Sequence, residues 1–152
     1  MRLLILAAVA AGLAAGCATQ SPYQARSEDS RYGYAELMVQ PNRVRISYNG
    51  DTLTPRETVE TYLLYRAAET TLQRGFDYFV ITAHDAGETT RYDAIGGRPR
   101  LGGVTIHEVS SHTAMAEIVM FMGAEPPPVA NVYDARAVQQ TLSERIVASE
   151  TH

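Results

Sequence analysis

TPRETVETYLLYRAAETTLQRGFDYFVITA, residues 54–83, is the stretch of sequence that decides the fold. Thr54 is predicted to be the N-cap of a helix, because proline at the first helical position and glutamate at the third complete a capping box. The helix is predicted to run to Arg74 and to stop at Gly75, whose freedom at positive φ suits the residue after a helix end.

The two faces of this helix differ in polarity. At 100° per residue its leucines and alanines cover a broad arc, and a narrow polar strip holds Arg66, Glu69 and Gln73. We expect Arg66 and Glu69 to pair with each other at i, i+3 spacing or with arginines of a strand. Such a helix is expected to pack on a sheet. Asp77–Ala83 is a continuous β-branched and aromatic run, which predicts the central strand of that sheet.

Two shorter strands are predicted before the helix. Tyr34–Gln40 and Arg43–Tyr48 are separated by Pro41-Asn42, a pair of residues typical of turns. In the second segment apolar and polar residues alternate, which indicates a half-buried strand with its apolar side chains turned inward.

The pattern changes after the predicted central strand. Residues 85–103 are polar and rich in glycine, and we expect a long, mobile connection. Val104–Ser110 and Met115–Met122 are predicted to form a hairpin that turns at residues 111–113. Asp134 is the predicted N-cap of a last helix. Its apolar positions are Ala135, Val138, Leu142 and Ile146.

The predicted order of elements is β-β-α-β-β-β-α. It indicates an α+β domain with a mainly antiparallel sheet of about five strands and two helices packed on one face of that sheet.

The first residues of the chain indicate export. Arg2 provides a positive charge, and Leu3–Leu13 is an apolar stretch far shorter than the ~20 residues of a spanning helix. Small residues follow and end at Cys17, an arrangement that resembles the lipobox of bacterial lipoproteins. Residues 1–16 are therefore predicted to be a signal peptide. An ordinary secreted protein with an incidental cysteine is the alternative.

The lipobox resemblance implies that Cys17 is lipidated. The thiol would receive a diacylglyceryl group, and cleavage before Cys17 would free its amino group for a further acyl chain. Three chains exceed the two signals that stable anchoring needs. In Gram-negative lipoproteins, Asp after the cysteine favours the inner membrane. Here Ala18 follows, so the resemblance implies the periplasmic face of the outer membrane.

The chain is expected to contain one folded unit after the signal peptide. Residues 17–31 are polar and lack apolar periodicity, which predicts a lipidated cysteine followed by a flexible tether. The remaining length suits a single α+β domain over residues 32–148, with a frayed C-terminus at 149–152.

Composition excludes several function classes. The formal net charge is −4, and this mild acidity argues against a nucleic-acid-binding surface. Cys17 is the only cysteine, which excludes an internal disulfide and thiol catalysis. All 13 basic residues are arginines, so Schiff-base lysine chemistry is excluded as well.

Tyr62–Glu69 (YLLYRAAE), followed by Gly75–Phe79 (GFDYF), forms a pattern that resembles a family of small, uncharacterised lipoproteins of Gram-negative bacteria. The resemblance implies a lipid-anchored envelope protein with no assigned activity, and it carries over no catalytic residue. Further segments similar to the family pattern are Tyr32–Tyr34 with Glu36, Asn42–Gly50, Ala116–Ile118 and Tyr133–Arg136.

Residues 96–103 (GGRPRLGG) are a candidate anion-binding loop. Backbone N–H groups together with Arg98 and Arg100 suit an anionic envelope glycan or lipid headgroup. The segment matches neither the P-loop nor the dinucleotide fingerprint, and a plain flexible surface loop is the alternative.

The histidines do not predict a metal site. His107 and Glu108 are neighbours on a predicted strand and point to opposite faces, and no tight zinc spacing occurs. We therefore predict no metal ion and no cofactor. The four histidines are His84, His107, His112 and His152.

A hydrolase is the weakest of three functional hypotheses. Ser110 or Ser111 with His112 and Asp85 supplies the residue types of a catalytic triad, but adjacent residues in a turn have poor triad geometry and no nucleophile elbow is present. We therefore predict no enzyme. An interaction or structural role in the cell envelope, with an envelope protein as candidate partner, comes first, and anionic glycan or lipid binding comes second. The oligomeric state stays open.

Overall fold

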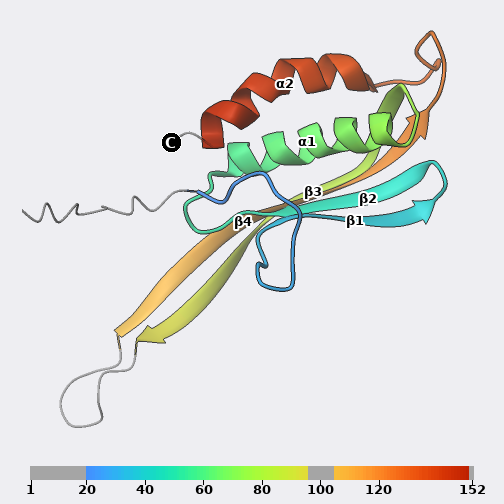
Figure 1. Cartoon of the computed structure of the whole chain (residues 1–152). Helices are drawn as coiled ribbons and strands as arrows, with labels where there is room; N and C mark the ends of the chain where they lie inside the picture. Colours follow the sequence, from blue (N-terminus) through green and yellow to red (C-terminus); the bar gives the residue numbers. More distant parts are fainter. Residues whose placement is uncertain (1–19, 96–104, 151–152) are drawn as a thin grey trace, which may run out of the picture.

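The protein is an α+β fold with a five-stranded antiparallel sheet and two helices on one face of it, as predicted (Figure 1). A computed structural model describes residues 20–95 and 105–150. The strand order across the sheet is β1-β2-β4-β3-β5. The elements are β1 (Gly33–Gln40), β2 (Arg43–Asn49), α1 (Arg56–Gln73), β3 (Tyr78–Ile95), β4 (Thr105–Phe121), β5 (Val132–Asp134) and α2 (Ala135–Glu150).

The predicted hairpin of the first two strands is confirmed. β1 and β2 pair antiparallel around Pro41-Asn42, and the register shifts between Met38 and Gln40, where β1 carries a bulge. The side chains that alternate inward from β2 are fully buried, and those between them are more exposed. The period-2 pattern in the sequence therefore reports the true faces of this strand.

The predicted capping box at the start of α1 is wrong. Pro55 occupies the N-cap position, and no side chain caps the helix. Thr54 is buried and its hydroxyl donates instead to Asp51 Oδ1 at 2.6 Å. The threonine is turned toward the preceding turn because a partner there competes with the helix amides. The helix end is confirmed: Gly75 has φ +81°, a conformation that glycine adopts at little cost.

The prediction for residues 85–122 is wrong in three ways. Residues 85–95, expected to be a loop, continue β3 to a length of 18 residues. Residues 111–113, expected to be a turn, lie inside β4, a single strand of 17 residues. The central strand is β4, with β3 beside it. The physical reason is that a two-stranded ribbon beyond the core needs no apolar face, so its strands carry no apolar pattern. The predicted loop 96–103 lies outside the described residues.

The last two elements follow the predicted pattern in part. Asp134 caps α2 as predicted, because its Oδ1 accepts the backbone N–H groups of Arg136 at 2.9 Å and Ala137 at 3.1 Å. β5 was not predicted, since its three residues are too short for a periodic signal. It pairs with β3 from Tyr78 to Val80 and forms one edge of the sheet.

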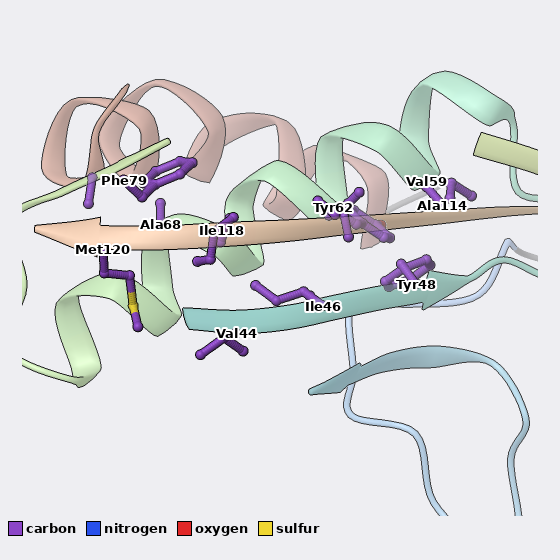
Figure 2. Packing of buried hydrophobic residues seen from close by; sticks show 14 of the residues in the cluster. Val44, Ile46, Tyr48, Val59, Tyr62, Ala68, Phe79, Ala114, Ile118 and Met120 are labelled. Atoms are coloured by element: carbon purple, nitrogen blue, oxygen red, sulfur yellow. The ribbon is translucent and has the colours of Figure 1, made fainter. Parts of the chain in front are cut away.

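The core lies between α1 and the helix-facing side of β2 and β4 (Figure 2). Ile46 and Ile118 are fully buried there, and Tyr62 of α1 lies against Tyr48 with ring centroids 5.0 Å apart. α2 adds Ala135 and Ile146 to the same cluster. Within the residues described, neither helix is both long and apolar enough to span a bilayer.

Replacing Ile118 by Ala tests this core. The substitution removes buried methyl groups from the central strand, so we expect the free energy of unfolding to fall by about 2–5 kcal/mol. The control is Leu37→Ala on β1, where the side chain is 59% exposed and the expected change is within about 0.5 kcal/mol. Urea denaturation followed by circular dichroism measures both, and equal losses would contradict the assigned core.

Candidate functional site

The segment from Gln20 to Arg26 is docked on the domain and does not form the flexible tether that we expected for residues 17–31. Ser21 is buried, and both its backbone N–H and its hydroxyl contact Thr54 Oγ1, at 3.1 Å and 2.9 Å. Tyr48 donates its hydroxyl to the carbonyl of Pro22 at 2.9 Å. The folded unit therefore begins before residue 32. Polar side chains and a single tyrosine ring attach the segment, and such scattered contacts leave no apolar periodicity in the sequence.

Tyr23 is the aromatic anchor of this docked segment. Its ring lies 5.2–5.4 Å, centroid to centroid, from the rings of Tyr34, Tyr62 and Tyr65, and two of these contacts are edge-to-face. Its hydroxyl donates to Glu69 Oε2. Burial raises the pKa of Tyr23 well above its ordinary range, and the bond to the Glu69 carboxylate raises this pKa further.

Arg66 holds the centre of a charged cluster beneath Tyr23. Its Nε donates to Glu36 Oε1 at 2.6 Å and its Nη1 to Glu69 Oε2 at 3.1 Å, which confirms the predicted i, i+3 pair. The guanidinium also lies 4.2 Å from the ring centroid of Tyr34. Burial acts to lower the pKa of Arg66, but the interactions with Glu36 and Tyr23 together outweigh burial, so this pKa is raised. The cluster is a structural clamp between α1, β1 and the docked segment.

A β arm extends from the rest of the sheet, and we define it as residues 87–95 of β3 and 105–112 of β4. β2 pairs with β4 only as far as Thr113, and Gly50 then donates to the carbonyl of His112 at the base of the arm. Beyond His112, the arm strands pair with each other alone within the described chain. The arm projects away from the helices (Figure 1). Eight residues beyond Gly87 give it a reach of about 27 Å at about 3.4 Å per residue.

The predicted lipidation and anion sites lie outside the described residues. This holds for the signal peptide, residues 1–16, for Cys17, and for Arg98 and Arg100. The chain positions are informative all the same. Residues 96–104 connect Ile95 to Thr105, so Arg98 and Arg100 belong to the connection between the two arm strands.

The residues of the hydrolase hypothesis are not brought together. Asp85 is opposite Met115, whereas His112 is opposite Glu88, three register positions further along β3. Ser111 and His112 are consecutive strand residues and point to opposite faces. His112 Nδ1 is buried and has no hydrogen-bond partner within the described part of the chain.

No metal-binding group of three or more His, Cys, Asp or Glu residues occurs in residues 20–95 and 105–150. His84 lies on β3 and His112 at the base of the arm. In the register of the sheet, His84 is opposite Ala116 and His112 is opposite Glu88. The described histidines therefore stand apart from each other.

A pocket that sequence reasoning missed lies between α1, β3 and β5. Its volume is about 160 Å³, and most of its lining is apolar. The sequence gives no signal for this pocket, because its lining residues come from four separate elements that meet only in the folded chain. The lining residues are Glu60, Leu63, Leu64, Ala67, Ile81, His84, Ala116 and Tyr133.

Comparisons with known proteins assign no family: no family model, no curated protein and no solved structure matches the chain.

Replacing Tyr23 by Phe tests the clamp. We expect the free energy of unfolding at neutral pH to fall by about 1.5 kcal/mol, at the low end for a hydrogen bond to a charged group, because Tyr23 is only half-buried. Because the pKa of Tyr23 is raised in the folded state, its hydroxyl contributes its full stabilisation below about pH 10, the pKa of tyrosine in the unfolded chain. This stabilisation is lost as the pH rises above about 10.

Thermal unfolding between about pH 8 and pH 11 measures this alkaline loss. Tyr65 also has a raised pKa, caused by burial and by Glu69, so Tyr65→Phe is the matched control for tyrosine titration in general. The wild-type chain is expected to lose more stability at high pH than the Tyr23→Phe chain. Identical pH profiles would contradict the role given to this hydroxyl.

Proposed function

We propose that the protein is a lipid-anchored lipoprotein of the bacterial cell envelope, at the periplasmic face of the outer membrane, and that it acts as an interaction or structural protein. The observation that carries the proposal is the β arm, which leaves the core and pairs only with itself among the described residues. An isolated two-stranded ribbon is marginally stable in water. Such a ribbon adds nothing to the core, so its purpose is to reach another molecule.

The docked segment supports this role because it shortens the connection to the anchor. Gln20 follows Cys17 by three residues, which span at most about 11 Å. Ser21 then accepts the backbone N–H of Asp51 at 3.1 Å, and the adjacent Gly50 donates its N–H to the carbonyl of His112 at the base of the arm. A lipid on Cys17 therefore holds the base of the arm close to the membrane.

The same arrangement supports a role without catalysis. The polar cluster around Arg66 is satisfied by its own carboxylates and joins three parts of the fold. Asp85 of the hydrolase hypothesis lies on β3, three register positions from the partner of His112, and is not brought to His112 and the serines of β4. We accordingly propose no substrate and no reaction.

Cys17→Ser tests the anchor. In a Gram-negative host, the wild-type chain is expected in the outer-membrane fraction, whereas the variant cannot be lipidated and is expected to be lost from that fraction. Ser is the closest match in size that lacks the thiol, so the comparison isolates lipidation. A variant that stays in the outer-membrane fraction after a high-salt wash would refute the lipid anchor.

A second candidate function is binding of an anionic envelope glycan or lipid by residues 96–103. The observation that favours it is topological, because Arg98 and Arg100 belong to the segment that joins the two strands of the arm. Guanidinium groups bind phosphate and carboxylate through two parallel hydrogen bonds.

Arg98→Ala with Arg100→Ala tests this second function. Binding of the purified protein to lipid A vesicles or to peptidoglycan fragments is expected to fall about tenfold, the equivalent of one lost charged contact. Arg26→Ala with Arg56→Ala removes the same charge from exposed positions elsewhere and is expected to leave binding unchanged. Equal binding by wild type and both double variants would dispose of this function.

A further inference from the structure

One edge of the sheet is left open along most of its length. β5 pairs with β3 only at Tyr78, Phe79 and Val80. From Ile81 onward, the outer edge of β3 has no paired strand within the described residues, although its inner edge pairs with β4 throughout. An unpaired strand edge presents a row of backbone N–H and C=O groups that another strand can bind.

The register shows which residues present these groups. In β4, His112 accepts from Gly50 and Met120 donates to Asn42, so even-numbered residues of β4 are directed toward the β2 side. Odd-numbered residues of β4 therefore bond to β3, where Asp85, Gly87 and Thr89 are their partners. The alternate β3 residues direct their backbone groups to the open edge. These residues are His84, Ala86, Glu88 and Thr90.

The apolar pocket opens beside this edge. Ile81 and His84 of β3 line it together with Leu64 of α1 and Tyr133 of β5. A second hollow of about 330 Å³ continues from Ile81 and His84 to Asn131, directly before β5. A cavity of about 150 Å³ holds a group the size of benzene. The pocket of about 160 Å³ therefore accepts one aliphatic or aromatic side chain.

The charge along this edge is negative. Glu60 lines the pocket from α1, and Glu88 lies further along β3. Neither carboxylate forms an ion pair with another described residue, whereas Glu36, Glu69 and Glu117 are all paired with arginines. Four residues separate His84 at the pocket from Glu88, which is about 14 Å along the strand. The carboxylates of Glu60 and Glu88 suit basic residues in a bound segment that also carries an apolar one.

We propose that this surface binds an extended peptide segment of a partner protein, which adds a strand to the open edge of β3 in line with β5. The segment inserts one apolar side chain into the pocket between α1, β3 and β5, and Lys or Arg residues beside it meet Glu60 and Glu88. Backbone hydrogen bonds supply the affinity and the pocket supplies the specificity, as in other cases of strand addition. This inference names a partner class for the interaction role proposed above and rests on that role.

A second copy of the chain fits this edge less well than a basic peptide does. The same β3 edge from a second copy would present histidine, alanine, glutamate and threonine at the positions that face the pocket side, and none of these is a large apolar residue. Symmetric pairing would also bring the acidic Glu88 of each copy to the same interface, where like charges repel.

Selection from a displayed library of random twelve-residue peptides tests the proposal on the purified Cys17→Ser chain. Enriched peptides are expected to contain an aliphatic or aromatic residue with Lys or Arg beside it. Hydrogen exchange in the free chain is expected to be fast at the amides of His84, Ala86, Glu88 and Thr90. The enriched peptide should slow exchange at these four amides, while Asp85, Gly87 and Thr89 are protected with or without peptide.

Glu60→Arg with Glu88→Arg reverses the two charges that the proposal uses and is expected to weaken binding of the enriched peptide by about tenfold or more. Glu28→Arg with Glu125→Arg makes the same charge change at exposed positions elsewhere and is expected to have no effect. No enrichment, unchanged exchange at the open edge, or a free chain that is already a dimer protected at these amides would each overturn the proposal. These outcomes do not involve the membrane, so they leave the lipid anchor and its own test untouched.

Discussion

The packing of α1 on β2 and β4 is the constraint on which the rest of the structure depends. Ala67 and Ala68 of the helix and Ala114 and Ala116 of β4 are all nearly or fully buried, and small side chains on both sides let the helix lie close to the sheet. The larger side chains of Ile118 and Tyr62 lie between Ala68 and Ala114 in this layer (Figure 2). Because the helices cover one face only, this layer is the whole core, and α2 and the docked segment both pack against it.

The position of α1 also determines the charged cluster. Burying the guanidinium of Arg66 without partners would be costly, and one carboxylate would not satisfy all of its N–H groups. α1 supplies Glu69 in the same helix and brings Arg66 against Glu36 of β1, while Thr70 adds a bond to Glu36 at 2.5 Å. Tyr23 then donates to Glu69 Oε2, the same oxygen that accepts from Arg66. The segment that follows the predicted lipid anchor is therefore attached through the polar strip of α1. A polar strip is ordinarily expected to face solvent, so the sequence pattern alone does not predict this contact.

Sequence patterns predicted the elements that have one buried and one exposed side, or whose ends are set by local backbone geometry. The alternation in β2, the length of α1, the stop at Gly75 and the cap at Asp134 all depend on a difference between a buried and an exposed side or on local backbone geometry, and all are confirmed. Residues 85–95 and 111–113 show no such difference in the sequence, so the first resembled a loop and the second a turn.

The candidate sites escaped prediction for a related reason. The pocket draws its lining from four elements, and the clamp joins Tyr23 to Glu69 across 46 residues of sequence. No spacing pattern within a short segment reports such contacts. Cys17, Arg98 and Arg100 are chemical predictions that depend on local sequence, and they stay predictions because they lie outside the described residues.

One edge of the sheet is protected against strand pairing and the other is not, and this difference supports a binding role for the open edge of β3. The outer edge of β1 is protected: Tyr34 exchanges backbone hydrogen bonds with Gln24 and Arg26, and the bulge after Met38 interrupts the edge before Pro41. Bulges, prolines and covering segments are the devices with which proteins prevent unwanted strand pairing. β3 has a bulge between Ile81 and Ala83, but its edge beyond that point carries no proline and no covering segment among the described residues. A chain that protects one edge and leaves a longer one open beside an apolar pocket has the asymmetry expected when the open edge receives a strand from another molecule.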